Sequence, residues 1–99
     1  MERYFDGFSN KEDVMGAFCV SEEQSEGVEI LYAWYDTSYD YEGYATVIFR
    51  KDGKIYEVNG SHCSCYGLEG QWEPEETSVV ALLARPNIAD EAKAILQSL

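Results

Sequence analysis

Apolar and polar residues alternate through the middle of the chain, which is the period of a β-strand. The pattern covers residues 28–36, 44–50 and 55–59. The last two runs are separated by Lys51-Asp52-Gly53-Lys54. Asp-Gly between alternating runs predicts a tight hairpin, because both central residues of a type I′ turn need positive φ. The sequence therefore predicts consecutive antiparallel strands in this region.

The first run is apolar on both sets of alternate positions. One predicted face carries Val28, Ile30, Tyr32 and Trp34, and the other carries Glu29, Leu31, Ala33 and Tyr35. Such a pattern is typical of a strand in the centre of its sheet. In the second run, Ala45, Val47 and Phe49 alternate against Tyr44, Thr46, Ile48 and Arg50.

Three segments carry apolar residues at helical spacing. Residues 9–18 predict a short helix that Ser9 or Asn10 can cap, with an apolar face of Val14, Met15 and Phe18. A second helix is predicted from Pro74 to Arg85, because proline fits the first turn of a helix. The third runs from Asn87 to Leu99, with a predicted buried stripe of Ile88, Ala92, Ile95, Leu96 and Leu99.

Two stretches lack such periodicity. Residues 21–27 predict a polar, acidic loop, and residues 60–73 predict a glycine-containing loop with a short fourth strand at 63–66. The predicted order is α-β-β-β-α-α. It corresponds to one α+β domain over residues 1–99, in which an antiparallel meander of three to four strands packs one face against three helices.

The charge of the chain changes what it is expected to bind. Nineteen acidic residues face seven basic ones, so the net charge is −12. Such a surface repels phosphate, which argues against direct binding to nucleic acid or to an anionic membrane. It attracts basic surfaces, and in a cell these are mostly the nucleic-acid grooves of other proteins. The competing interpretation is that the charge serves solubility alone.

Location is inferred from the ends and the cysteines. The chain has no apolar run of the length that a membrane span needs, and its first six residues lack the regions of a signal peptide. The three cysteines are an odd number, which fits reduced thiols better than a disulfide framework. We therefore expect a cytoplasmic protein.

The acids cluster in a way that suggests a binding face. Asp36, Asp40 and Glu42 are interleaved with Tyr39 and Tyr41. Tyrosine offers a large contact area at low entropic cost, and it is enriched in interface hot spots. Three further acids complete the predicted partner-binding set, namely Glu69, Glu73 and Glu76. The alternative is a solvated loop whose tyrosines fold back on the sheet.

A second group of residues suggests a metal or a reactive thiol. His62, Cys63 and Cys65 lie within four residues, and Cys19 is a candidate fourth ligand for zinc. The Cys-x-Cys spacing has no second pair, and free cysteines are common in cores. The leading expectation is therefore no cofactor and no catalytic residue, with zinc as the alternative. Trp72 is expected to be a core anchor.

Residues 56–76 contain the run Asn59-Gly-Ser-His-Cys-Ser-Cys-Tyr-Gly-Leu-Glu-Gly-Gln-Trp-Glu-Pro-Glu-Glu76. This run resembles a stretch found in small uncharacterised proteins of tailed bacteriophages, and the similarity covers roughly residues 44–85. The resemblance implies a phage origin and a place in the host cytoplasm, but it transfers no residue roles. Small acidic phage proteins are often inhibitors of host defence, transcription or replication, and some mimic DNA.

These observations lead to one functional hypothesis and two alternatives. The leading hypothesis is a non-enzymatic phage accessory protein that binds and inhibits a host protein with a basic, nucleic-acid-binding surface, with DNA mimicry as one mode. The first alternative is a small zinc- or thiol-dependent protein centred on His62, Cys63 and Cys65. The second is a homodimeric structural or assembly domain that pairs through an exposed sheet edge.

Overall fold

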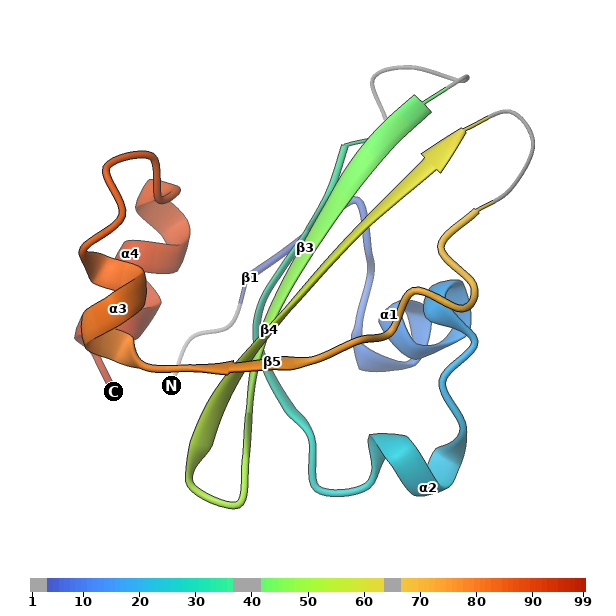
Figure 1. Cartoon of the computed structure of the whole chain (residues 1–99), viewed down its shortest axis with the longest axis horizontal. Helices are drawn as coiled ribbons and strands as arrows, with labels where there is room; N and C mark the ends of the chain where they lie inside the picture. Colours follow the sequence, from blue (N-terminus) through green and yellow to red (C-terminus); the bar gives the residue numbers. More distant parts are fainter. Residues whose placement is uncertain (1–3, 37–41, 64–66) are drawn as a thin grey trace.

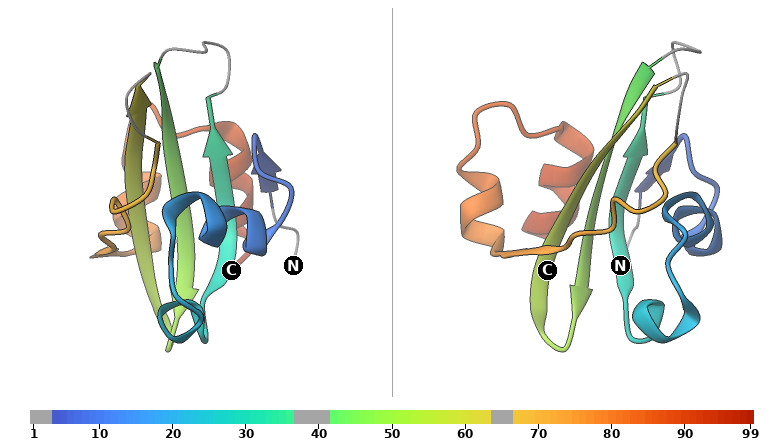
Figure 2. Two further views of the ribbon diagram at one scale, coloured as in Figure 1. Left: turned by 90° about the vertical axis from the view of Figure 1, so that its right-hand side faces the viewer. Right: turned by 45° about the vertical axis from the view of Figure 1, so that its right-hand side comes forward.

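The computed structural model describes residues 4–36, 42–63 and 67–99 (Figure 1). These residues form a five-stranded sheet with helices on both of its faces (Figure 2). The strands are β1 (Tyr4–Asp6), β2 (Glu29–Tyr35), β3 (Glu42–Lys51), β4 (Lys54–Cys63) and β5 (Glu75–Thr77). The helices are α1 (Lys11–Phe18), α2 (Glu22–Ser25), α3 (Val79–Leu83) and α4 (Asp90–Gln97). The predicted α+β class is confirmed, whereas the numbers and order of elements differ from the prediction.

The sheet has the order β1-β2-β3-β4-β5. Strands β2 to β5 form the expected antiparallel meander, and β1 adds to the edge of β2 in parallel. The sheet is therefore mixed, which the sequence did not predict. A strand of three residues carries no measurable period, so β1 is recognised only by its pairing with residues 32–34.

The predicted hairpin is confirmed. Asp52 and Gly53 have φ values of 53° and 77°, as a type I′ turn requires. Arg50 and Glu29 are register partners on β3 and β2, and their side chains form an ion pair at 2.7 Å. The alternation in β3 is also as predicted, because Ala45, Val47 and Phe49 belong to one core cluster.

A bulge at Leu31 overturns the predicted faces of β2. Ile30 pairs with Phe49 and Tyr32 pairs with Ile48, so Leu31 is an extra residue in the ladder. An extra residue shifts every later side chain to the opposite face. Val28, Ile30, Ala33 and Tyr35 consequently share one face, while Leu31, Tyr32 and Trp34 share the other. The bulge lets both Ile30 and Leu31 be fully buried.

Helices cover both faces, rather than the single face that was predicted. Helix α1 packs Val14, Met15 and Phe18 against the first face. Its N-cap is Asn10, whose side chain accepts a hydrogen bond from the Asp13 N–H at 2.9 Å. Helices α3 and α4 pack against the second face through Leu82, Ala92, Ile95 and Leu96. The sheet therefore has an apolar core on each of its two faces, which explains why β2 is apolar on both sides.

Two further expectations are wrong. The helix predicted from Pro74 begins only after Ser78, because Glu75–Thr77 pairs with the edge of β4 as β5. The Ser78 side chain then caps α3 by accepting from the Ala81 N–H. The loop predicted at 21–27 contains the short helix α2, which Ser21 caps. The short strand expected at 63–66 falls mostly on residues 64–66, which lie outside the described part, and Cys63 is the last residue of β4.

The loop that follows residue 66 folds back on the first face of the sheet. Leu68 is buried there, and the Trp72 ring stacks on Phe49 and meets Phe18 edge-on. The expectation that Trp72 anchors the core is confirmed. A Cβ on Gly60 would lie 3.0 Å from Phe18 and 3.1 Å from Leu68, so any larger residue there would have to displace these two side chains by a few tenths of an ångström. Packing thus explains Gly60, Leu68 and Trp72 in the run of residues 59–72.

None of the helices in the described ranges is both long and apolar enough to cross a membrane.

Candidate binding groove

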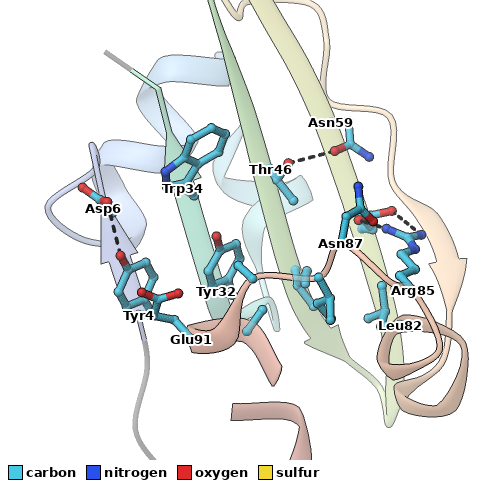
Figure 3. A pocket seen from close by; sticks show the side chains of 15 residues that line it. Tyr4, Asp6, Tyr32, Trp34, Thr46, Asn59, Leu82, Arg85, Asn87 and Glu91 are labelled. Carbon is cyan, nitrogen blue, oxygen red and sulfur yellow. Dashed lines mark hydrogen bonds and ion pairs between the residues drawn. The ribbon is translucent and has the colours of Figure 1, made fainter. Parts of the chain in front are cut away.

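A groove of about 620 Å³ lies between the second face of the sheet and the helical layer formed by α3 and α4 (Figure 3). Its floor consists of two rows of register partners that cross four strands. One row is Tyr4, Tyr32, Ile48 and Glu57, and the other is Asp6, Trp34, Thr46 and Asn59. Its wall is formed by Leu82, Arg85, Asn87, Ile88, Ala89, Glu91 and Ala92.

The groove exists because the helices cover only part of this face. They bury Ile48 and Tyr32 in the core between this face and helices α3 and α4. Farther along β3, Tyr44 is 61% exposed. Each row steps from β1 to β4 across neighbouring strands, which lie about 4.8 Å apart, so the floor spans about 14 Å. That span equals about four residues of extended chain.

Aromatic rings form the β1–β2 end of the groove. The rings of Tyr4 and Tyr32 are stacked, with centroids 5.3 Å apart and planes inclined by 9°. Trp34 lies on the same face in the adjacent row and is half-buried. Aromatic faces attract cations through the ring quadrupole, so three rings in one end of a groove favour a positively charged ligand.

Two carboxylates accompany these rings. The Tyr4 hydroxyl donates to Asp6 Oδ2 at 3.2 Å, and Glu91 lies beside Tyr4 (Figure 3). Burial raises the pKa of Tyr32 to about 12, with smaller contributions from Tyr4, Glu91 and Asp6. The pKa of Tyr4 is raised by burial, by its hydrogen bond to Asp6 and by the charge of Glu91. The negative potential of both acids therefore reaches the aromatic end.

The opposite end contains a bidentate ion pair. Arg85 Nη1 donates to Glu57 Oε2 at 2.6 Å, and Nη2 donates to Glu57 Oε1 at 2.8 Å. Glu57 is only 7% exposed and is the sole buried charged residue in the described part of the chain. The hydrogen bond to Glu57 raises the pKa of Arg85, so the guanidinium stays charged. Thr46 Oγ1 donates to Asn59 Oδ1 at 2.9 Å beside this pair.

The charged side chains that line the groove are three carboxylates and one guanidinium. Because Glu57 is paired with Arg85, the excess negative charge lies with Asp6 and Glu91 at the aromatic end. This arrangement can hold a lysine or arginine side chain against the rings while the two acids neutralise it.

The predicted partner-binding residues do not line this groove where the structure describes them. Tyr39, Asp40, Tyr41 and the side chain of Glu42 lie outside the described part. Asp36 follows β2, and its N–H donates to the carbonyl of Tyr44 at 2.8 Å. The remaining three acids, Glu69, Glu73 and Glu76, are exposed on the loop after residue 66 and on β5. Glu76 faces Lys54 at 3.7 Å, near the hairpin turn.

Sequence reasoning missed Asp6, Trp34, Glu57, Arg85 and Glu91 as site residues. One signal was present, because the alternation in β4 puts Glu57 between Ile55 and Asn59 on one face. A lone acid at such a position needs a charged or hydrogen-bonding partner, and Arg85 supplies it. The other groove residues meet only through the parallel pairing of β1 and the placement of α4.

The proposed zinc ligands are only partly described. His62 Nδ1 is hydrogen-bonded to the Tyr35 hydroxyl at 2.8 Å, and their rings are perpendicular. The pKa of Tyr35 is raised by burial and by the nearby charge of Glu69. Cys19 is exposed at the end of α1, while the side chain of Cys63 and all of Cys65 lie outside the described part. Within the described part, no three His, Cys, Asp or Glu side chains are grouped as metal ligands. The zinc alternative stays a prediction.

Comparisons with protein-family models, with curated proteins and with solved structures found no match. The resemblance of residues 56–76 to phage proteins therefore stays a prediction, and the geometry of the groove carries the functional inference.

Proposed function

We propose that this protein is a non-catalytic binding protein that captures a basic segment of another protein in the groove. The observation that supports this proposal is that three aromatic rings and two carboxylates lie together at one end of the groove. A cation–π contact contributes about 0.5–1 kcal/mol at an exposed site and about 2 kcal/mol when water is excluded. Carboxylates beside the rings add charge-assisted hydrogen bonds.

The net charge supports the same partner class. At −12, the protein attracts a basic partner over a distance and speeds their encounter, and salt weakens both effects. Nucleic-acid-binding proteins present basic surfaces and tails. A host defence, transcription or replication component is therefore the partner that we propose, and inhibition follows if the bound segment is one that contacts nucleic acid.

The distribution of exposed acids favours capture in the groove over imitation of a DNA backbone. Exposed acids occur in the first turns of α1, α2 and α4, in the β3–β4 turn and on β5. These elements lie on both faces and at an edge of the sheet (Figure 2). A mimic needs its carboxylates along one track, so we propose DNA mimicry only as the weaker form.

A fluorescence titration with oligo-arginine tests the proposal. Trp34 lies in the groove and Trp72 lies against the opposite face, so a Trp34→Phe variant identifies which indole responds. We expect saturable binding that changes Trp34 emission. The double variant Asp6→Asn/Glu91→Gln is expected to weaken binding about tenfold, from the loss of two charge-assisted contacts.

A matched control separates the groove from overall charge. The variant Glu12→Gln/Glu23→Gln removes the same charge from α1 and α2, which lie away from the groove. We expect it to weaken binding by less than about twofold. Equal losses in the two double variants, or a response from Trp72 alone, would show that the groove is not the binding site.

A further inference from the structure

The groove differs in character from one end to the other. Its aromatic end offers the oxygens of Asp6 and Glu91, which accept hydrogen bonds. Its opposite end offers donors. Glu57 accepts from two N–H groups of Arg85, and a guanidinium carries more donors than these. Arg85 is 46% exposed, so the rest of its fork is accessible to a ligand in the groove.

Two amides extend this donor end. Asn59 accepts a hydrogen bond from Thr46 through Oδ1, and its exposed side chain also carries the two N–H donors of Nδ2. Asn87 lies on the same side of the groove as Arg85 (Figure 3). A guanidinium flanked by amide donors is suited to an oxygen acceptor that carries negative charge.

We propose, resting on the function proposed above, that the donor end binds a terminal carboxylate and that the groove therefore takes the C-terminal tail of the basic partner. The ends of the floor are about 14 Å apart, which four extended residues can span. A basic side chain about two residues before the terminus then reaches the rings while the carboxylate meets Arg85. A basic partner has few acidic side chains to offer, whereas every chain ends in a carboxylate.

The test uses an N-acetylated Gly-Arg-Gly-Gly peptide with a free carboxylate and its C-terminal amide, titrated against Trp34 fluorescence. We expect the amide to bind about tenfold more weakly, because one charge-assisted interaction is lost. A peptide with citrulline in place of arginine is expected to lose a similar factor. A third probe, the amidated Gly-Arg-Gly-Asp, offers a side-chain carboxylate and is expected to bind no better than the other amide.

Variants of the protein locate the carboxylate. Loss of Arg85 leaves Glu57 buried without its partner and can unfold the protein, so the decisive variant is Asn59→Ala/Asn87→Ala, which keeps the ion pair. Arg85 remains in this variant, so the preference for the free acid is expected to fall from about tenfold to about threefold, through the loss of the two amide donors alone. A full preference in this variant would overturn the assignment.

The failures of the two proposals are distinguishable. Equal binding of acid and amide, with arginine still required, would overturn the carboxylate site and leave the cation site intact. Tight binding of the amidated aspartate peptide would assign the donor end to an internal acidic side chain and overturn the C-terminal tail. No binding of any arginine peptide would overturn the proposed function itself.

Discussion

Replacement of Gln71 by glutamate is expected to destabilise this protein, because the amide side chain joins a loop to an open sheet edge. Its Oε1 accepts from the Ser61 N–H at 2.9 Å, and its Nε2 donates to the carbonyls of Ser61 at 2.6 Å and Gly67 at 2.8 Å. Strand β5 pairs with only residues 55–57 of β4, so the Gln71 amide acts farther along that edge in place of a neighbouring strand.

The magnitude follows from what the substitution removes. Glutamate keeps an acceptor for the Ser61 N–H but loses both donors, and a net hydrogen bond contributes about 1 kcal/mol. The carboxylate also faces two carbonyl oxygens, while water can reach the half-buried site and limits the repulsion. We expect a loss of about 2–3 kcal/mol in the free energy of unfolding. In a domain of this size that corresponds to a fall of about 10–15 °C in Tm.

Thermal unfolding followed by circular dichroism measures this loss. The control is Gln24→Glu, which makes the same change of charge at an exposed position in α2. We expect the control to change stability by about 0.5 kcal/mol or less. If Gln71→Glu lowers Tm no more than Gln24→Glu does, the run in residues 59–72 is not held by this amide, and a recognition role for it would become the better explanation.

Two further predictions concern glycine positions and pH. Gly16→Ala should stabilise the protein by about 0.5–1 kcal/mol, since a Cβ there meets no atom within 4 Å and alanine favours a helix. Gly60→Ala should destabilise it by about 1–3 kcal/mol through contact with Phe18 and Leu68. If denaturant unfolding shows that Gly16→Ala and Gly60→Ala change the free energy of unfolding in the same direction, the packing described around Gly60 is contradicted. Burial raises the pKa of Tyr32 to about 12, so the folded state favours the neutral phenol. The stability that results is complete below about pH 10 and is lost as the pH rises through 12. Between pH 10 and pH 12, the free energy of unfolding should fall less in Tyr32→Phe than in the unchanged protein. An equal fall in both would show that ionisation of Tyr32 does not cause the loss of stability.

The features of the fold that could be predicted from the sequence are those that depend on neighbouring residues. The Asp52-Gly53 turn, the alternation along β3 and the cap of α1 by Asn10 all follow from interactions within a few positions. The α+β class followed too, because strand and helix periods are local properties of the chain. The apolar content of both sets of positions in β2 correctly indicated a strand inside the sheet.

How these parts meet depends on contacts between residues that are far apart in the chain. The three residues of β1 have too short a pattern to predict, and they become a strand by pairing with residues 32–34. The bulge at Leu31 reassigns a whole face, because a single inserted residue reverses the two-residue period. The groove needs both events, together with an ion pair between Glu57 and Arg85 that are 28 positions apart. Pairing at such separations is decided by the summed burial and hydrogen bonding of the whole fold, which no local pattern encodes.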